Sequence, residues 1–317
     1  MNKEDKNQPE SREVVIIGSG PAGLSAALYT ARADLEPVVL TGMTLHGQAS
    51  VTDIIENYPG FPEGIGGSEL GQLFQSQAER FGAEIVMDQV TSVDLTQKPF
   101  QIITYGKQYA ANSVIISTGA AHKKLGIPGE KEFTGRGVSY CATCDGWFFK
   151  DKDVVVVGGG NSALEEGLFL TRFANTVTII HRRDELRAGV ILQNRAFDNP
   201  KMRFIWDTVV TEISGQDAIN EITLKNVKTG EEIIHQTDGV FIFIGHTPNS
   251  QLFSSQLEVD KQGYLEINKY MGTSIPGVFA AGEVADPNFR QVITSAGMGA
   301  AAAIEAVRYL EALHDPE

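Results

Sequence analysis

A glycine-rich pattern occurs twice in this chain, and it restricts the possible folds more than any other feature. The first copy is Gly18-Ser-Gly-Pro-Ala-Gly23, directly after Glu-Val-Val-Ile-Ile at residues 13–17, which is expected to be a short buried strand. The second is Gly158-Gly-Gly-Asn-Ser-Ala163, after the run Val154 to Val157, and each of its positions lies 140 residues after the matching position of the first. An apolar strand, a G-x-G-x-x-G turn and a helix are together typical of a dinucleotide-binding unit. Two copies in register predict two such units in one chain.

Each turn contributes candidate nucleotide-binding residues. Its first glycine permits a tight bend, its second lets the backbone approach a pyrophosphate, and its third position allows close packing of helix against strand. The N-terminus of the following helix supplies free amide donors. We expect these helices over Leu24 to Arg32 and from about Leu164 onward. The candidates are Gly18, Gly20, Pro21, Ala22 and Gly23 in the first turn, and Gly158, Gly160, Asn161, Ser162 and Ala163 in the second.

A basic cluster follows the second copy and indicates which nucleotide binds there. The strand expected at Thr176 to Ile180 ends in His181-Arg182-Arg183, and Arg187 comes four residues later. An NAD site usually has an Asp or Glu at this point, bound to the ribose 2′-hydroxyl. Guanidinium groups instead hold a 2′-phosphate through charge-assisted hydrogen bonds. The cluster therefore favours NADPH over NADH, with a solvated helix start as the alternative interpretation.

The ligand of the first copy is less clearly marked. Its second strand, expected at Pro37 to Leu40, ends in Thr41-Gly42, which is neither acidic nor basic. A later segment predicts a strand that ends in Gly282-Glu283. Arg290-Gln291 and a helix of small residues from about Ser295 follow it. Two-domain flavoproteins use such a returning segment to hold the flavin, so FAD is favoured; an ordinary strand–helix unit that completes a sheet is the alternative.

The order of these segments predicts that one unit is inserted into the other. Residues 1–120 and 248–317 would form a discontinuous FAD-binding domain, and residues 121–247 an NADPH-binding domain. The joints are expected at Ser117-Thr-Gly119-Ala and at Gly245-His-Thr-Pro248, where strand ends meet small or turn-forming residues. The predicted fold class is α/β, with two Rossmann-like dinucleotide-binding domains of the FAD/NAD(P)-binding flavoprotein type.

The only two cysteines, Cys141 and Cys144, form a C-x-x-C pair just before the second glycine-rich unit. At the start of a short helix this spacing lowers a thiol pKa and favours reversible disulfide formation. A zinc half-site would need further ligands, and the six histidines form no H-x₃₋₅-H pattern, so no metal site is expected. A buried structural pair is the remaining alternative. Asp145 follows directly and could either exchange a proton with a thiolate or cap the turn.

Together these features predict an electron relay. NADPH carries a hydride, a flavin can accept it and pass two electrons to a nearby disulfide, and the resulting dithiol can attack a substrate disulfide. The C-x-x-C spacing alone does not say which thiol attacks.

Bulk composition excludes several other classes of protein. With 317 residues, 42% of them hydrophobic, the chain is long enough for two globular domains. A net charge of −14 and a pI near 4.9 argue against nucleic acid as a partner. The polar N-terminus carries no secretory signal, and no run reaches the roughly 18 apolar residues that span a membrane. A cytoplasmic location without membrane contact is expected.

Over about residues 12–313 the sequence resembles the low-molecular-weight, bacterial-type thioredoxin reductases. Besides the two glycine-rich turns, the segments that carry the resemblance are His46-Gly-Gln48, Glu56-Asn57-Tyr-Pro-Gly60, Cys141-Ala-Thr-Cys-Asp-Gly146, His181-Arg-Arg183 and Arg290-Gln-Val-Ile-Thr-Ser-Ala-Gly297. The strand end Thr41-Gly42 is usual in that family.

The resemblance implies an NADPH-dependent thioredoxin-disulfide reductase that is a homodimer with one FAD per chain and thioredoxin as substrate. It implies that Cys144 lies nearer the flavin, that Asp145 is the acid–base group, and that the NADPH domain swings relative to the FAD domain. The family has Asp where this chain has Glu283, and we expect the longer carboxylate still to reach the ribityl hydroxyls. Beyond the two turns and the basic cluster, the expected cofactor contacts are Thr41, Gly42, Gly47, Gln48, Asn57, Gly119, Gly282, Glu283, Arg290, Gln291 and Val292.

Related functions remain as alternatives. A ferredoxin-dependent flavin thioredoxin reductase has the same fold but lacks the basic cluster. The flavoprotein partner of a peroxidase typically carries an extra N-terminal thioredoxin-like domain, whereas about a dozen residues precede the first strand here. A ferredoxin–NADP reductase would lack the C-x-x-C pair. A non-enzymatic flavin and dithiol redox sensor would differ from an enzyme in showing no turnover with NADPH.

Overall fold

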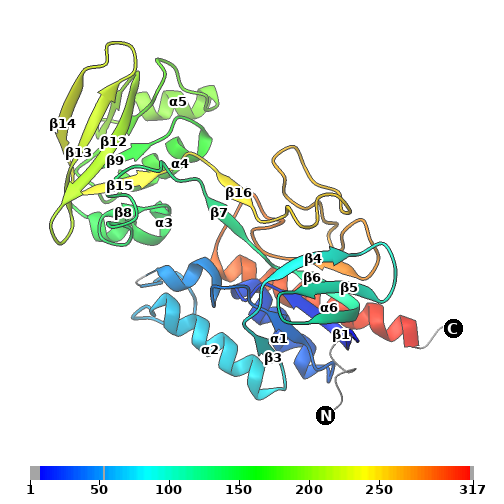
Figure 1. The fold of residues 1–317 in the computed structure, drawn as a ribbon. Helices are drawn as coiled ribbons and strands as arrows, with labels where there is room; N and C mark the ends of the chain where they lie inside the picture. The colour runs from blue at the N-terminus through cyan, green and yellow to red at the C-terminus, as the bar shows by residue number, and fades with distance from the viewer. Residues whose placement is uncertain (1–7, 53, 315–317) are drawn as a thin grey trace. The chain divides into compact units, whose positions relative to one another are not determined.

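The computed structural model describes residues 8–52 and 54–314, which divide into two compact units. Unit 1 is the chain up to Ala121 and from Thr247 onward, and unit 2 is His122–His246. Each unit is built on a sheet with parallel strands and accompanying helices (Figure 1). The α/β fold class expected from the sequence is confirmed.

Unit 1 contains a seven-stranded sheet in the order β3-β2-β1-β6-β5-β4, with β17 paired to the C-terminal part of β6. Strands β1, β2, β3, β6 and β17 are parallel, whereas β4, β5 and β6 form an antiparallel meander. The strands are β1 (Glu10–Ile17), β2 (Val38–Leu40), β3 (Glu84–Val86), β4 (Val90–Asp94), β5 (Phe100–Thr104), β6 (Gln108–Ile116) and β17 (Val278–Ala280).

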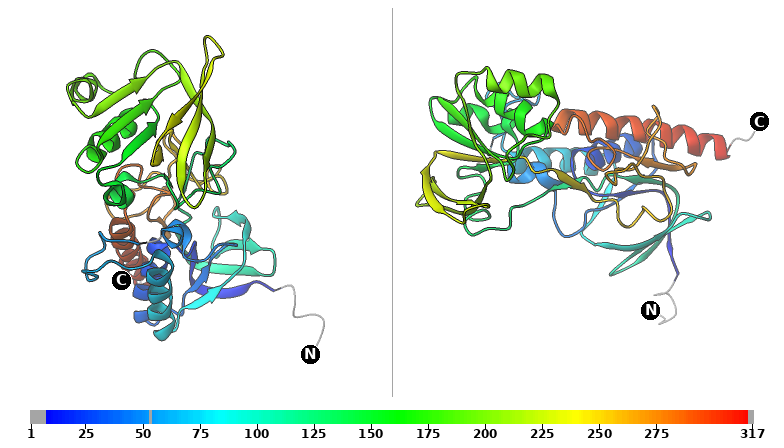
Figure 2. Two further views of the ribbon diagram at one scale, coloured as in Figure 1. Left: turned by 90° about the vertical axis from the view of Figure 1, so that its left-hand side faces the viewer. Right: turned by 90° about the horizontal axis from the view of Figure 1, so that it is seen from above.

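The two faces of this sheet are covered by different material, as the alternation of side chains in a strand requires. Val14 and Ile16 of β1 pack with alanines of the helices, whereas Val15 and Ile17 pack with the meander and with Phe253. Small alanine side chains let α1 and α6 run close together, side by side (Figure 2). The helical segments of unit 1 are α1 (Pro21–Arg32), the 3₁₀ turn η2 (Gly47–Val51), α2 (Gly67–Arg80) and α6 (Val292–His314).

Unit 2 contains the same arrangement that opens unit 1: a strand, a glycine-rich turn, a helix and a parallel neighbouring strand. Its sheet has the order β11-β10-β9-β15-β8, with every pair parallel. The strands are β8 (Val138–Ser139), β9 (Asp153–Val157), β10 (Thr176–Ile180), β11 (Met202–Ile205) and β15 (Gly239–Ile242). The helices are α3 (Ala142–Asp145), η3 (Gly146–Phe149), α4 (Asn161–Leu170) and α5 (Val190–Phe197).

A second, antiparallel sheet completes unit 2, and two short strands link the units. The antiparallel sheet consists of β12 (Thr208–Gly215), β13 (Ile219–Asn226) and β14 (Glu232–Gln236). Its Ile222 and Leu224 pack against Val155 and Val240 of the parallel sheet. The linking strands β7 (Ala120–His122) and β16 (His246–Pro248) pair with each other where the chain passes between units.

Three helices begin three residues earlier than their apolar patterns indicated. α1 starts at Pro21 rather than Leu24, α4 at Asn161 rather than about Leu164, and α6 at Val292 rather than about Ser295. In α1 the extended Gly20 is the N-cap and proline takes the first helical position, where its missing N–H costs nothing. The last residues of the glycine-rich turns therefore belong to the helices themselves.

The contact between α1 and α6 can be tested with two glycines of one helix. A Cβ on Gly299 would lie 2.0 Å from the backbone oxygen of Ala22, whereas a Cβ on the exposed Gly297 would meet nothing within 4 Å. We expect Gly299→Ala to destabilise unit 1 by about 1–3 kcal/mol through overpacking. Gly297→Ala should instead stabilise it by up to about 1 kcal/mol through helix propensity. Thermal unfolding midpoints measure both effects, and a Gly299→Ala protein as stable as Gly297→Ala would refute the close contact.

Candidate functional site

The first glycine-rich turn closes against the end of β6 so tightly that only glycine fits. Gly18 has a φ of +112°, and a Cβ there would lie 2.4 Å from the backbone oxygen of Ser117. A Cβ on Gly23 would lie 1.9 Å from the oxygen of Gly18. Gly20, the N-cap of α1, has open space where its Cβ would be. The turn thus presents the start of α1 to solvent, ready for a phosphate.

Other predicted segments meet at this turn. A Cβ on Gly47 would lie 3.1 Å from the Cα of Gly20, and a Cβ on Gly282 would lie 3.0 Å from the Cβ of Ala22. The side-chain amide of Gln48 donates a hydrogen bond to the oxygen of Ala120, next to Gly119. The structure therefore brings together candidates from three distant parts of the chain.

The candidates Thr41 and Gly42 lie at the end of β2, which pairs with β1. Their amides donate to the oxygens of Val86 and Asp88, and Gly42 has a φ of +71°. Thr41 is buried and its hydroxyl donates to the oxygen of Gly42. This strand end has no carboxylate of its own, as its sequence indicated.

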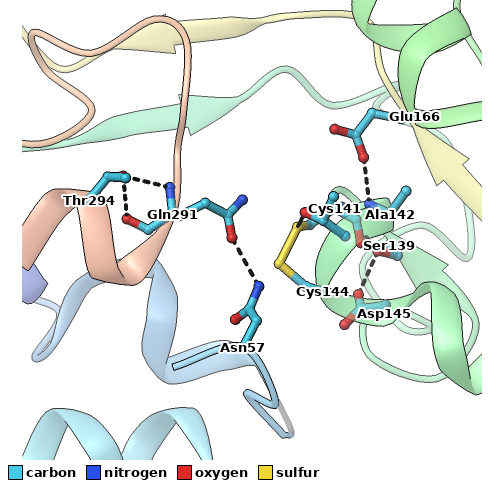
Figure 3. The surroundings of a disulfide bond; sticks show 10 residues. Asn57, Ser139, Cys141, Ala142, Cys144, Asp145, Glu166, Gln291 and Thr294 are labelled. Atoms are coloured by element: carbon cyan, nitrogen blue, oxygen red, sulfur yellow. Dashed lines mark hydrogen bonds between the residues drawn. A yellow bond between two sulfur atoms is a disulfide. The ribbon is translucent and has the colours of Figure 1, made fainter. Parts of the chain in front are cut away.

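Asn57 and Gln291 are 234 residues apart in sequence and in direct contact. The side-chain nitrogen of Asn57 donates to Oε1 of Gln291 at 3.0 Å (Figure 3). Gln291 immediately precedes Val292, the first residue of α6, and its own backbone oxygen accepts from the hydroxyl of Thr294. Both candidates are thus held at the N-terminal end of α6.

Glu283 lies in a partly buried charged cluster just after β17. Burial raises the pKa of Glu283 to about 7; neighbouring Arg290 opposes this shift and Asp286 adds to it. The Asp286 carboxylate accepts hydrogen bonds from the backbone amides of Asn288, Phe289 and Arg290. Arg290 has a φ of +52°, and within the described chain its Nε is buried without a hydrogen-bond partner. A buried donor of this kind is available to bind a polar group.

The second glycine-rich turn has the same construction in unit 2. Gly158 has a φ of +153°, and a Cβ there would lie 2.5 Å from the oxygen of Phe243 at the end of β15. Gly160, the extended N-cap of α4, again faces open space. The side-chain oxygen of Asn161 accepts from the amide of Gly189, which ties the loop before α5 to the turn.

The basic cluster surrounds a buried imidazole beside this turn. The ring of His181 packs so closely on Gly159 that a Cβ there would lie 2.4 Å from it. Burial lowers the pKa of His181, and the positive charges of Arg187, Arg183 and Arg182 lower it further. The backbone amide of Arg187 donates to the oxygen of Gly159 at 2.7 Å. Three exposed arginines therefore lie close enough to His181 to act on its charge, and their guanidinium groups are available to an anionic ligand.

The two cysteines form a disulfide at the start of α3. Cys141 is the N-cap of this short helix, and its Cα lies 5.3 Å from that of Cys144. Ser139, at the end of β8, makes two hydrogen bonds to the turn. Its Oγ accepts from the amide of Cys141 at 3.1 Å and donates to Oδ2 of Asp145 at 2.5 Å (Figure 3). The carboxylate that follows the cysteines is thus fixed to the same serine as the first cysteine.

Two further polar residues at this site were not predicted. Ser139 connects Cys141 to Asp145, and Glu166 of α4 accepts a hydrogen bond from the amide of Ala142 at 3.1 Å. Ser139 could have been suspected because it stands two residues before a redox pair. Glu166 gave no sequence signal, because its partner is a backbone amide supplied by another helix.

No group of three or more His, Cys, Asp or Glu side chains among the described residues could hold a metal ion. No helix within residues 8–52 and 54–314 is long and apolar enough to cross a membrane.

Comparison with known proteins identifies the family. The family model for pyridine nucleotide-disulphide oxidoreductases matches residues 12–299. A thioredoxin reductase of Streptomyces clavuligerus is 51% identical over 309 residues, which cover 96% of both chains. That of Rickettsia typhi is 52% identical over 303 residues, covering 94% of this chain and 98% of the relative. The crystal structure of thioredoxin reductase from Streptococcus pyogenes has a TM-score of 0.91 and 44% identity, covering 96% of this chain and all of that one.

The chain belongs to the pyridine nucleotide-disulphide oxidoreductase family. Membership implies a flavin and a pyridine nucleotide as cofactors, and the chain has two glycine-rich turns of like construction. It also gives the Cys141–Cys144 disulfide a redox role rather than a structural one.

In this member of the family, the acid Glu283 makes stability depend on pH. Its folded-state pKa of about 7 lies above the ordinary value of 4.5, so its contribution is fully present below about pH 4.5 and is lost as the pH rises through about 7. The buried carboxylate then costs up to about 3 kcal/mol. In protein freed of flavin, we expect Glu283→Gln to raise the thermal unfolding midpoint at pH 8.5 and to leave it nearly unchanged at pH 4.5.

The exposed Glu63 provides the matched control for this pH dependence. Glu63→Gln removes the same charge from unit 1 and should have little effect at either pH. Equal effects of Glu283→Gln at the two pH values would show that Glu283 is not held protonated by burial.

Proposed function

We propose that this chain is an NADPH-dependent thioredoxin reductase that passes two electrons from NADPH, by way of FAD, to its Cys141–Cys144 disulfide and then to oxidised thioredoxin. The observation that carries the proposal is the disulfide itself, formed at the start of a helix in a unit whose glycine-rich turn is flanked by three arginines. About half of all residues are identical to those of thioredoxin reductases along nearly the whole chain. Thioredoxin is therefore the proposed substrate.

Unit 1 is proposed to bind FAD. Its residues fit that group: Gly20 leaves open space at the start of α1, and the buried Nε of Arg290 has no hydrogen-bond partner among the described residues. FAD would supply the capacity to take up a hydride and release its two electrons to a disulfide. The proposed contacts are the first glycine-rich turn together with Thr41, Gly42, Gly47, Gln48, Asn57, Gly119, Gly282, Glu283, Arg290, Gln291 and Val292.

Unit 2 is proposed to bind NADPH. The amides at the start of α4 would bind the pyrophosphate, and Arg182, Arg183 and Arg187 would bind the 2′-phosphate. The lowered pKa of His181 means that it contributes a neutral ring, packed on Gly159, rather than a further charge. The proposed contacts include Gly158, Gly160, Asn161, Ser162 and Ala163 of the turn.

The proposed cycle reduces the Cys141–Cys144 disulfide and then forms it again by thiol–disulfide exchange. Two electrons and two protons break the Cys141–Cys144 bond and give two thiols. One thiolate attacks a sulfur of the thioredoxin disulfide and forms a mixed disulfide, and the second cysteine then displaces reduced thioredoxin. Asp145, held by Ser139, is the proposed group that moves the proton between solvent and the cysteine sulfurs.

We further propose that the active form is a homodimer in the cytoplasm. The support is the resemblance to bacterial-type thioredoxin reductases and the cysteine content, because two cysteines spaced as C-x-x-C suit a reducing compartment better than an oxidising one.

The cysteine pair provides the decisive test of function. Wild-type protein with NADPH and thioredoxin should reduce a disulfide reporter, whereas Cys141→Ser and Cys144→Ser should both fall to background because neither can cycle. Both variants should still bleach their flavin with NADPH, as followed by visible absorbance. Turnover by either variant would contradict the relay. A flavin that NADPH does not bleach would instead indicate a protein electron donor such as ferredoxin.

The arginines test the choice of nucleotide. Each charge-assisted hydrogen bond to a 2′-phosphate is worth about 1.5–3 kcal/mol, so Arg182→Ala with Arg183→Ala should together raise the KM for NADPH by about 100-fold or more. The KM for NADH, which has no 2′-phosphate, should change little. Arg172→Ala is the control, because this exposed arginine of unit 2 contacts only the ring of Phe169 among the interactions described. Equal losses with both nucleotides would contradict the phosphate assignment.

A further inference from the structure

Glu166 connects the helix of the second glycine-rich turn to the redox disulfide. It lies in α4, and its Oε2 accepts the amide hydrogen of Ala142, the first residue of α3, at 3.1 Å (Figure 3). α3 and α4 pack against each other, and Glu166 is partly buried, whereas the preceding Glu165 is exposed. A carboxylate is thus held against the first amide after Cys141.

The amide of Cys141 is also connected to a carboxylate, by way of a serine. It donates to Oγ of Ser139, which in turn donates to Oδ2 of Asp145. The amide of Ala142 therefore donates directly to a carboxylate, and the amide of Cys141 is linked to a second carboxylate through Ser139. Asp145 belongs to α3 itself, Ser139 to β8 and Glu166 to α4.

This arrangement opposes the usual effect of a helix start on a cysteine. Free amides at a helix N-terminus stabilise a thiolate and lower the thiol pKa. A dithiol stabilised in this way is a poor electron donor, as the strongly oxidising DsbA shows, because its reduced form is the stable one. A reductase needs the reverse, a dithiol that gives up its electrons readily.

We propose that Glu166 is a positioning residue that tunes the redox pair: its carboxylate accepts the amide hydrogen of Ala142 and adds a negative charge next to the turn that carries Cys141, so that the dithiol remains a strong electron donor. This role rests on the proposed function, since it presumes that the pair cycles. Reduction adds two electrons and two protons to the disulfide, and the carboxylate favours the protonated thiol over the thiolate.

The first test measures the ionisation of Cys141 alone. In a Cys144→Ser background Cys141 is the only thiol, so the rate of its alkylation by iodoacetamide against pH gives its pKa. Adding Glu166→Gln should lower this pKa by about one unit, because a like charge is removed. Glu231→Gln, at an exposed position of unit 2, removes the same charge far along the chain and should leave the pKa unchanged.

The choice of glutamine separates charge from structure. The side-chain oxygen of glutamine can still accept the Ala142 amide hydrogen, so a purely structural role predicts that Glu166→Gln behaves as wild type and that only Glu166→Ala differs. The proposal predicts that both substitutions lower the pKa. An unchanged pKa in Glu166→Gln, in protein with the wild-type thermal midpoint and flavin content, overturns the proposal.

The second test measures the pair itself in the flavin-loaded protein. Wild type and Glu166→Gln are equilibrated with mixtures of reduced and oxidised dithiothreitol, and thiols are counted by the gel shift of a maleimide polymer, which is unambiguous with two cysteines. At a pH one unit or more above the Cys141 midpoint, Glu166→Gln should shift the equilibrium up to about tenfold toward the dithiol, equivalent to about 30 mV. Below the midpoint of the variant, where both thiols are protonated in either protein, the two should converge.

Neither test uses NADPH or thioredoxin. Their results therefore distinguish a failure of the proposed function from a failure of the role proposed for Glu166. A wild-type pair that even excess dithiothreitol never reduces would overturn the proposed function and the role of Glu166 with it. A pair that titrates identically in wild type and Glu166→Gln at every pH would overturn the role of Glu166 alone.

Discussion

Backbone packed directly on backbone is the constraint on which both units depend. In unit 1 the end of β6 touches the first glycine-rich turn, where a Cβ on Gly18 would lie 2.4 Å from the oxygen of Ser117. In unit 2 the end of β15 touches Gly158 through the oxygen of Phe243. These contacts bring each helix start to the carboxyl edge of its sheet, where the amides remain open. No larger residue could occupy these positions without moving the helix and closing the site.

Local features of the chain could be predicted from the sequence because short-range physics determines them. The strand expected at Thr176 to Ile180 is found with those bounds, and both glycine-rich turns lie between a strand and a helix. The helix starts were misplaced by three residues, because an apolar, helix-like composition does not mark the cap and first turn of a helix. The α/β fold followed from the repetition of the pattern rather than from any single motif.

Contacts between distant backbone and side-chain groups could not be predicted. The convergence of Gly47 and Gly282 on the first turn depends on how a sheet of seven strands arranges segments more than 200 residues apart. The hydrogen bond from Ala142 to Glu166 depends on the packing of α3 against α4. A backbone amide has the same chemistry at every residue, so no sequence pattern marks the one that a carboxylate will meet.

Positive and negative side chains gather at different places within unit 2. The protein as a whole carries a net charge of −14, yet three arginines lie around His181. Two carboxylates, those of Asp145 and Glu166, take up the hydrogen bonds of the redox turn. α4 begins at the open amides of the nucleotide turn and carries Glu166 one turn and a half further on, so a single helix fixes both local environments.

The interrupted order of unit 1 has a consequence for synthesis on the ribosome. Its sheet lacks β17 and its α1 lacks the covering helix α6 until residues 278–314 have been made. The segment of unit 2, residues 122–246, leaves the ribosome complete before that point, and domains generally fold as units while the chain is elongated. The inserted unit can therefore fold first, and the unit that contains both ends of the described chain must wait for its last helix.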